Sequence, residues 1–292
     1  MAVITTEKLT KYYGRTRGIA EIDLTVEEGE FFGFIGPNGA GKTTTIRTLL
    51  NFIFPTSGRA EIFRMDCARK SAEIKKDIGY VPGEVRYYTG MKAGELLDYC
   101  ASLRKNVDRK RMLRLCDIFE VESGKRIGEL SLGNLKKVAI VQALQHRPKL
   151  LLLDEPASGL DPLMQTRLFE ILKEENSRGT TIFLSSHNLA EVQRHCLRVA
   201  FLREGRIIED RKIHELAGLN ACRVRISAEG DIAAALGSLG VHEFEETTGY
   251  KEFIYNGSID ALIKAIAGLK VKDLRIENIQ LEDAFMHYYE KE

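Results

Sequence analysis

The chain has 292 residues, of which 44% are hydrophobic and 29% charged, as is typical of a globular protein with roughly two domains. Its 43 basic and 42 acidic residues balance, which excludes a general attraction to nucleic acid or to an anionic membrane. No run approaches the ~18 to 20 uncharged apolar residues that cross a bilayer, and the N-terminus lacks a secretion signal. The five widely spaced cysteines suggest neither disulfides nor a zinc site, so we expect a cytoplasmic protein. From the balanced charge we expect no nucleic-acid partner.

In chain order, residues 1–35 contain β-rich runs such as AEIDLTV and FFGFI, and a helix is predicted from about Lys42 to Leu50. Residues 93–145 carry apolar positions at three- and four-residue spacing, which predicts that they are wholly helical, within a helical subdomain of about 84–145. The continuous apolar runs LLLLD (150–154), TTIFLSS (180–186) and LRVAFL (197–202) are separated by helical segments. They predict buried parallel strands and an α/β core.

The character of the sequence changes after about Leu219. Four alternating segments (223–227, 241–246, 250–255 and 271–276) enclose two helical segments, which predicts the order β-α-β-β-α-β. This order resembles a small ferredoxin-like α+β domain, closed by a final helix LEDAFMHYYE. From Asn220 onward there are 8 basic and 13 acidic residues, a net charge of 8 − 13 = −5. We therefore expect two domains, 1–218 and 219–292, of which the second is acidic.

The stretch GPNGAGKT at 36–43 is the strongest chemical signal. Its G-x-x-x-x-G-K-T spacing lets several backbone N–H groups point at an anion, and the following helix presents its positive N-terminal end to the same place. Lys42 would reach the terminal phosphates and the Thr43 hydroxyl would bind Mg²⁺. The alternative is an ordinary glycine-rich turn, but the strand before it and the helix after it favour a nucleoside triphosphate site.

A pair of carboxylates follows an apolar strand in LLLLDEP. This arrangement places Asp154 near the metal and Glu155 where it could orient an attacking water. No base-reading NKxD element of a GTPase is present. Further short motifs are LSLGNLKK (130–137), SGLDP (158–162) and SSH (185–187).

These five elements, in this order, resemble the ATP-binding subunit of ABC transporters over roughly residues 1–218. The resemblance implies a P-loop NTPase core with an N-terminal antiparallel β subdomain and an α-helical insert. It also implies ATP and Mg²⁺ as ligands and a second nucleotide-binding subunit, the same or different, that meets this one head to tail. The residues implied around the phosphates are Gly36, Pro37, Asn38, Gly39, Ala40, Gly41, Lys42, Thr43 and Thr44.

The resemblance implies roles for individual residues outside the phosphate loop. Asp154 would bind Mg²⁺ through water, Glu155 would polarise the hydrolytic water, and His187 would contact the γ-phosphate. Asp161 would cross the dimer interface, Ser131 and Gly133 would serve the partner's ATP, and Tyr13 would stack on the adenine ring. From the residues alone, His187 could equally be a capping or core histidine, Ser131 a plain helix N-cap, and Tyr13 a core or interface tyrosine.

Two positions depart from the family pattern. Gly83 stands where a glutamine normally senses the metal, the water and the membrane subunit, with Glu84 beside it as a possible substitute. Leu132 and Asn134 replace the glycine and glutamine of the commoner LSGGQ signature. We expect the ATP sandwich to form because Ser131 and Gly133 are retained.

The combination YxPGE, LSxGN, SGLDP and LEDAF (281–285) resembles the ATP-binding subunits of ABC-2 type exporters of drugs, antibiotics or polysaccharides. Such a subunit hydrolyses ATP for a separately encoded permease at the inner face of the membrane. We expect the coupling surface at about 84–97, with Tyr87, Tyr88 and Met91 gripping a permease helix. Two alternatives are a soluble ABC protein unconnected with transport and a weakly hydrolysing ATP-binding partner in a heterodimer.

Overall fold

A computed structural model of the chain describes residues 1–104, 108–215, 222–237, 239, 241–247 and 249–278. The chain divides into two compact units, Met1–Arg211 and Lys212–Glu292, called here the first and second units. The predicted domain boundary between residues 218 and 219 lies outside the described residues. The predicted final helix (281–290), with its LEDAF motif, also lies outside them.

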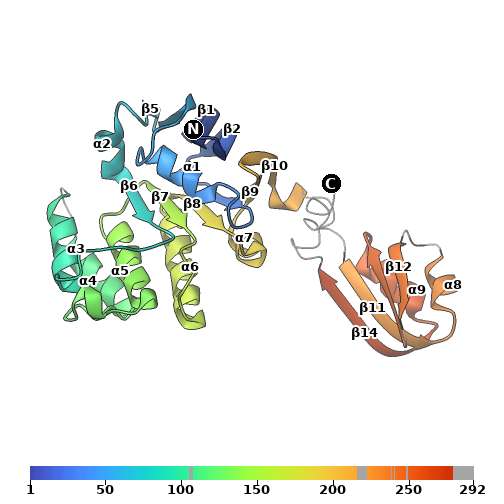
Figure 1. Ribbon diagram of the computed structural model, residues 1–292. Helices are drawn as coiled ribbons and strands as arrows, with labels where there is room; N and C mark the ends of the chain where they lie inside the picture. The colour runs from blue at the N-terminus through green and yellow to red at the C-terminus, as the bar shows by residue number, and fades with distance from the viewer. Residues whose placement is uncertain (105–107, 216–221, 238, 240, 248, 279–292) are drawn as a thin grey trace. The chain divides into compact units, whose positions relative to one another are not determined.

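The first unit is built around a six-stranded sheet, whose strands are β3 (Phe31–Ile35), β6 (Ile78–Val81), β7 (Leu150–Asp154), β8 (Thr181–Ser186), β9 (Arg198–Arg203) and β10 (Arg206–Lys212). Their order is β10-β9-β3-β8-β7-β6, and Figure 1 labels all of them except β3. The pairings of β3 with β8 and β9 and of β7 with β6 and β8 are parallel. Every residue of β3, β7 and β8 is buried, which confirms the predicted buried parallel strands.

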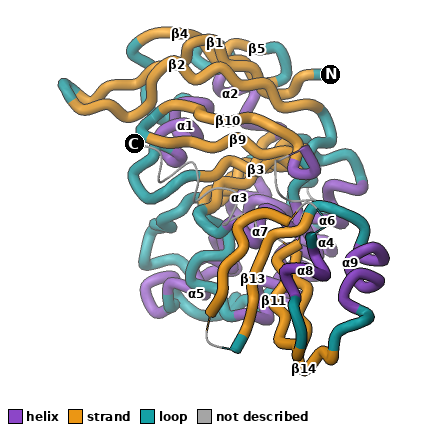
Figure 2. Tube along the Cα trace, turned by 90° about the vertical axis from the view of Figure 1, so that its right-hand side faces the viewer, coloured by secondary structure: helices purple, strands orange, loops and turns teal. Residues whose placement is uncertain are grey.

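An antiparallel sheet at the start of the chain contains β1 (Ala2–Tyr13), β2 (Thr16–Glu27), β4 (Ser57–Ile62) and β5 (Met65–Asp66) in the order β2-β1-β4-β5. Helix α1 (Lys42–Leu49) contacts β2 and β4 of this sheet and β7 of the parallel one. Figure 2 labels α1 together with β2 and β4 of the antiparallel sheet and β3 of the parallel one. One hydrophobic cluster contains Leu9 of the antiparallel sheet, Ile46 of α1 and Phe183 of the parallel sheet, so it joins the helix to both sheets. The helix that follows the glycine-rich stretch is therefore fixed between the two sheets. A short helix α2 (Ser71–Ile74) and a 3-10 turn η1 (Lys75–Asp77) lead into β6.

The helical insert comprises α3 (Ala93–Ser102), α4 (Arg109–Ile118), a 3-10 turn η2 (Ile127–Glu129) and α5 (Leu132–Leu144). The prediction of a wholly helical segment over 93–145 is wrong at 119–126, which is irregular. Glu120 there has a left-handed backbone with φ of 53°, which a helix cannot contain. The chain turns at this point so that η2 leads into α5. Two further helices, α6 (Pro162–Ser177) and α7 (Leu189–His195), follow β7 and β8.

The second unit is a four-stranded antiparallel sheet with two helices. Its elements are β11 (Cys222–Glu229), α8 (Ile232–Leu236), β12 (Val241–Thr247), β13 (Tyr250–Tyr255), α9 (Ile259–Ile266) and β14 (Lys270–Asn278). The sheet order is β12-β13-β11-β14. Alternate residues such as Val224 and Ile226 pack with Leu262 and Ile266 of α9, while Arg225 between them is exposed. The second unit therefore has a core of its own.

Candidate functional site

The glycine-rich stretch forms a loop between β3 and α1. Gly41 stands at the N-cap of α1 with φ of 110°, a conformation that side chains with a Cβ rarely adopt. Gly36 has an ordinary φ, but a Cβ on it would lie 2.3 Å from the carbonyl oxygen of Leu202. The two glycines therefore serve different purposes: Gly41 permits the turn, and Gly36 permits close packing against β9.

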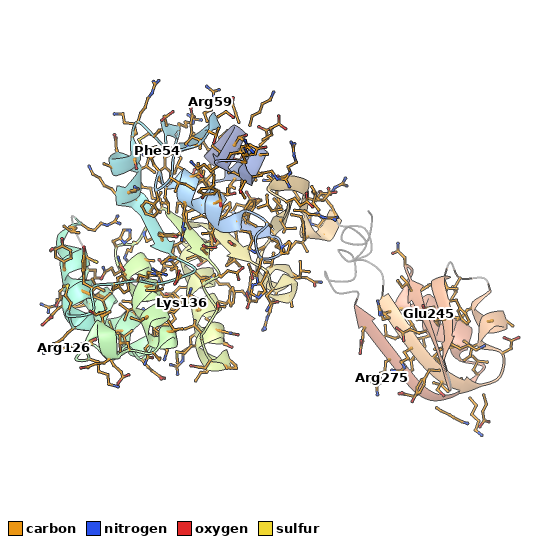
Figure 3. The ribbon with its side chains drawn as sticks, viewed as in Figure 1. Phe54, Arg59, Arg126, Lys136, Glu245 and Arg275 are labelled. Carbon is orange, nitrogen blue, oxygen red and sulfur yellow. The ribbon has the colours of Figure 1, made fainter. Side chains whose placement is uncertain are left out.

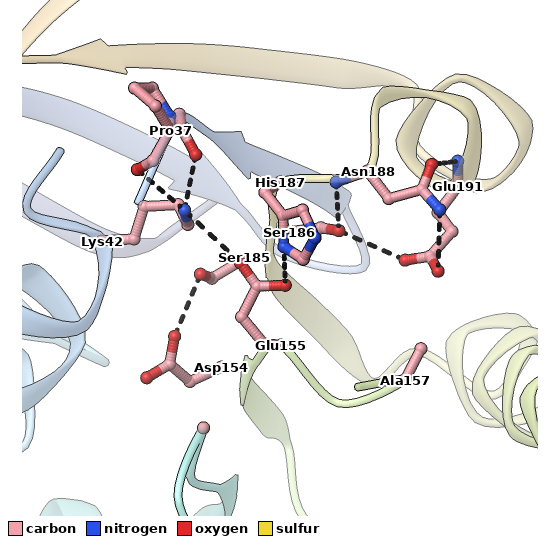
Figure 4. A network of polar contacts seen from close by, with 12 residues as sticks. Pro37, Lys42, Asp154, Glu155, Ala157, Ser185, Ser186, His187, Asn188 and Glu191 are labelled. Atoms are coloured by element: carbon pink, nitrogen blue, oxygen red, sulfur yellow. Dashed lines mark hydrogen bonds and ion pairs between the residues drawn. The ribbon is translucent and has the colours of Figure 1, made fainter. Parts of the chain in front are cut away.

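Lys42 directs its ammonium back over this loop. Its Nζ donates to the carbonyl oxygens of Gly36 (2.5 Å) and Pro37 (3.2 Å), and it lies 3.4 Å from Oε1 of Glu155. Figure 4 shows these contacts at one end of a continuous polar network. The side chain is only 6% exposed, so its charge acts at short range within the site.

Asp154, at the end of β7, is buried and is held by two hydroxyl groups. The Thr43 hydroxyl donates to Oδ2 (2.7 Å) and the Ser185 hydroxyl, from the adjacent strand β8, donates to Oδ1 (3.1 Å). The two predicted magnesium ligands are thus in direct contact, although 111 positions separate them in the sequence.

Glu155 lies in a left-handed turn with φ of 49°, an unusual conformation for a residue with a side chain. Its N–H donates to the carbonyl oxygen of Ser185 (3.0 Å), and its Oε2 accepts a hydrogen bond from Nδ1 of His187 (2.8 Å). Its Oε1 is buried without a hydrogen-bond donor among the described residues. One carboxylate oxygen is therefore oriented by His187, and the other faces the Lys42 ammonium at 3.4 Å without a hydrogen bond.

A cavity of 350 Å³ lies over the loop and is lined by Tyr13, Arg17, Gly18, Pro37, Asn38, Gly39, Gly41, Lys42, Thr43, Thr44 and Glu155. Tyr13 is half exposed, and the ammonium of Lys11 lies 5.4 Å from its ring centre. The predicted alternative of a core tyrosine is therefore wrong for Tyr13. The structure brings this aromatic ring to the same cavity as the phosphate loop.

Ser131, Gly133 and Asp161 lie elsewhere, and none of them is among the described residues that line this cavity. The Ser131 hydroxyl caps α5 by accepting from the N–H of Asn134 (3.3 Å), and Asp161 caps α6 by accepting from the N–H of Met164 (2.9 Å). The neighbouring Leu132 is 78% exposed. These residues therefore belong to a different part of the surface from the cavity that the phosphate loop lines.

Comparison with known proteins gives the same family by three routes. A family model described as ABC transporter matches residues 19–158. An uncharacterized ABC transporter ATP-binding protein of Synechocystis is 31% identical over 97% of this chain and 84% of its own. The bacitracin transport ATP-binding protein of Enterococcus faecalis is 31% identical over 87% of this chain and 89% of its own.

The chain belongs to the ATP-binding subunits of ABC transporters. A solved dimeric ATP-binding cassette in a post-hydrolysis state, bound to ADP and Pi, has a TM-score of 0.66 and 25% identity over 72% of this chain and 98% of its own. As a member of this family, the chain binds ATP and hydrolyses it to drive transport. In its described part, no helix is long and apolar enough to span a membrane.

In this ATP-binding subunit, the sequence reasoning missed Glu191 on α7. Its carboxylate accepts from the Ser186 hydroxyl (3.2 Å) and from the Asn188 side-chain amide (3.2 Å), so it contacts the residues on both sides of His187 (Figure 4). Burial raises the pKa of Glu191, and the nearby carboxylate of Glu155 raises it further. The signal was present in the sequence, since Asn188 followed three residues later by glutamate is a helix-capping pattern.

The sequence reasoning also missed Lys136 on α5, which is 4% exposed and lies in the interior of the first unit (Figure 3). Its Nζ donates to the carbonyl oxygens of Pro82 (3.0 Å), Gly83 (2.9 Å) and Glu155 (3.2 Å). Burial lowers the pKa of this ammonium, while Asp154 and Glu155 act against that shift. A lysine on the otherwise apolar face of α5 was the available signal.

Proposed function

We propose that this subunit energises an ABC-2 type exporter whose permease is a separate chain. The observation that carries the proposal is the alignment with a bacitracin transport ATP-binding protein, which spans nearly the full length of both chains. The YxPGE, LSxGN and SGLDP motifs support the same group. The subunit would then lie in the cytoplasm at the inner face of the membrane, and the permease would select the transported substrate.

We propose that residues 36–44 hold the ATP phosphates and that Thr43 and Asp154 hold Mg²⁺, the aspartate through water. The hydroxyl and carboxylate oxygens of this pair are the hard ligands that Mg²⁺ prefers, and they already converge to 2.7 Å. Bound magnesium would neutralise charge on the β- and γ-phosphates. Lys42 would exchange the carbonyl oxygens of Gly36 and Pro37 for phosphate oxygens, which are stronger acceptors for an ammonium.

In the proposed hydrolysis, Glu155 orients the attacking water. The buried Oε1 forms no hydrogen bond among the described residues and faces the Lys42 ammonium at 3.4 Å, so it retains the capacity to accept a hydrogen bond from the water. His187 keeps the opposite oxygen in place at 2.8 Å and would contact the γ-phosphate. The left-handed turn at Glu155 projects this carboxylate into the cavity beside Lys42.

We propose that two nucleotide-binding subunits meet head to tail, with Ser131 and Gly133 of one facing the ATP held by the other. This accounts for their position outside the cavity that Lys42 and Thr43 line. A Cβ at position 133 would lie 2.7 Å from the carbonyl oxygen of Gly159, so a glycine is needed where α5 begins. Asp161, exposed at the start of α6, would contact the second subunit.

For the permease we propose a groove of 220 Å³ beside the helical insert, whose walls include Phe52, Tyr80 and Leu103. Phe52 and Leu103 are largely exposed, so a short apolar helix of the permease would cover them. Tyr87 bonds to Gln142 on the groove wall and belongs to the fold, whereas Tyr88 is 83% exposed and available to a partner.

Alanine at both Phe52 and Leu103 should therefore weaken co-purification with the permease by roughly tenfold or more, because two exposed anchors are lost. Basal hydrolysis by the purified subunit should change by less than about twofold, since neither residue lines the ATP cavity. A double variant that assembles normally would remove this groove from the proposal.

The second unit has the strand and sheet order of a ferredoxin-like fold, and we propose that class for residues 219–292. Its net charge of −5 from Asn220 onward gives it little affinity for nucleic acid. We propose that it supports assembly of the transporter and takes no part in the chemistry.

Three assays test the function as a whole. The purified subunit should hydrolyse ATP, the Glu155→Gln variant should bind ATP without turnover, and the subunit should co-purify with a membrane protein. A wild-type chain without turnover, unchanged by Glu155→Gln, would instead indicate an ATP-binding partner in a heterodimer. Normal turnover without any membrane partner would indicate a soluble ABC protein.

A further inference from the structure

The buried ammonium of Lys136 joins two loops that are separate in the sequence. Pro82 and Gly83 follow β6, and Glu155 follows β7, the neighbouring strand of the sheet. An ammonium has three N–H groups, and all three are used on carbonyl oxygens at 2.9 to 3.2 Å. Among the described residues this ammonium forms no ion pair, so its acceptors are backbone carbonyl oxygens and not a carboxylate. Burying a charge costs free energy unless its donors are satisfied, and these three carbonyl oxygens satisfy those of Lys136.

The carbonyl oxygen that Lys136 contacts belongs to a residue with a strained backbone, Glu155. With φ of 49°, this residue occupies a left-handed conformation that residues other than glycine rarely adopt. The N–H of Ser158 also donates to this carbonyl oxygen, at 3.2 Å. Lys136 therefore holds the peptide that sets the direction of the Glu155 carboxylate.

In the other loop that Lys136 contacts, the residue beside the site is Gly83, which has no side chain. A Cβ on Gly83 would lie 3.1 Å from Oδ2 of Asp154, so the bare backbone packs against this carboxylate. The same loop continues as the segment 84–91, which carries the exposed Tyr88 and the Tyr87 bond to the groove wall. The contact between this segment and Glu155 is thus supplied from α5 by Lys136.

We propose that Lys136 is a positioning residue that couples the segment 82–92 to Glu155, so that displacement of either loop moves the other. The proposal rests on the proposed roles of Glu155 in hydrolysis and of the groove in permease docking. Because the ammonium binds both loops, it transmits nucleotide occupancy outward to the segment and permease movement inward to the turn. Lys136 itself need not touch the nucleotide.

The kinetic test compares Lys136→Met, which keeps the length of the side chain but removes its donors, with Lys136→Arg, which keeps them. Met should lower kcat about tenfold or more with KM for ATP changed less than about twofold, and Arg should recover much of the loss. Lys137→Met is the matched control: Lys137 is the next residue of α5, is 9% exposed and has no hydrogen bond or ion pair among the described residues. It should leave kcat unchanged.

A second readout separates coupling from a general loss of structure. In a Glu155→Gln background, ATP and Mg²⁺ should slow amide hydrogen exchange in residues 36–44 and in residues 82–92. Adding Lys136→Met should abolish the response of 82–92 and preserve that of 36–44. If Lys136→Met does not fold, as judged by its melting transition, Lys136→Gln is measured in the same way, since it keeps two N–H donors.

A response of 82–92 that survives in either variant, or a normal kcat in the folded variant, would overturn the proposal. Lys42→Ala distinguishes this failure from a failure of the proposed function. If Lys42→Ala abolishes turnover while Lys136→Met does not, only the role of Lys136 is wrong. If neither substitution affects turnover, the proposed function is wrong as well.

Discussion

The two units differ in what they bury. In the first unit the buried residues include Lys42, Lys136, Asp154 and Glu175, whereas the buried residues of the second unit, within its described ranges, are all hydrophobic. Burying a charge costs free energy unless partners satisfy it, so buried charges persist where chemistry requires them. Three of these four residues contact the phosphate loop, Glu155 or Thr43. The comparison teaches that function can be inferred from polar residues in the interior, and that an apolar interior indicates only a fold.

Lys42→Ala should give the largest effect and tests the first side of this comparison. The ammonium faces the cavity at 6% exposure, and among the described residues the Glu155 carboxylate pairs only with Lys42 and His187. We expect turnover to fall by about a thousandfold because a charge aimed at developing phosphate charge is removed. Steady-state hydrolysis by the purified subunit measures this, and a loss of less than about tenfold would contradict the role of Lys42.

Leu262→Ala tests the second half of the comparison, that the apolar interior of the second unit serves only its fold. Leu262 is fully buried in the core of the second unit, so the substitution should lower the unfolding free energy of that unit by about 3 kcal/mol. Turnover should stay within about twofold, because none of the described residues of the second unit lines the ATP cavity. Denaturant unfolding and hydrolysis by the same preparation provide both values. A large loss of turnover in protein whose first unit remains folded would break the comparison.

Acid should destabilise the first unit. Burial lowers the pKa of His146 and His195 to about 4, with nearby Arg104 lowering that of His146 and Lys173 and Arg194 that of His195. Between pH 6.5 and 4 the unfolded chain therefore binds more protons, and stability falls with pH in this window. At pH 5 we expect a loss of about 1 kcal/mol for each histidine, because both rings keep some contact with solvent.

Urea unfolding at pH 7 and pH 5 measures this loss. His195→Phe is a useful control because it preserves packing against Phe169, on which the ring of His195 stacks at 4.1 Å. This variant should retain about half of the pH dependence, since His146 still titrates. A stability of the first unit that does not change between the two pH values would show that these histidines are not buried as described.

Glu191→Ala should have the smallest effect and sharpens the comparison within the first unit. Loss of the contacts with Ser186 and Asn188 loosens the residues that flank His187, so we expect kcat to fall about fivefold. Glu191→Gln, which keeps hydrogen-bonding groups, should be close to wild type. Glu170→Ala is a matched control on α6, because Glu170 is exposed and forms no hydrogen bond or ion pair among the described residues. Equal activities in all three variants would leave Glu191 with no role at His187.

Strands and the order of elements could be predicted where the spacing of apolar residues along the chain reveals them. The buried strands β7 and β8 were predicted because parallel strands are apolar throughout, and the order of elements in the second unit was predicted from alternation. The irregular segment 119–126 was missed because helical spacing on both sides concealed a turn that depends on one left-handed residue, Glu120.

The contacts at the site were only partly predictable. The closeness of Thr43 and Asp154 follows from the motifs. Strand β3, which leads into the loop before Thr43, and strand β7, which ends in Asp154, have their carboxyl ends at the same edge of the sheet. The burial of Lys136 does not follow from its spacing, because whether a lysine lies inside or outside depends on carbonyls more than fifty residues away at Pro82 and Gly83. Likewise, nothing in the order Tyr87–Tyr88 indicates which of the two side chains belongs to the fold.

The central claim is that two subunits enclose ATP between the phosphate loop of one and the LSLGN segment of the other. The most direct measurement is an experimental structure of the Glu155→Gln variant with ATP and Mg²⁺. We predict a head-to-tail pair in which the Ser131 hydroxyl and the Gly133 backbone lie at hydrogen-bonding distance from the γ-phosphate bound by the other subunit's Lys42. A structure with ATP bound at every phosphate loop and Ser131 directed away from every phosphate would contradict the claim.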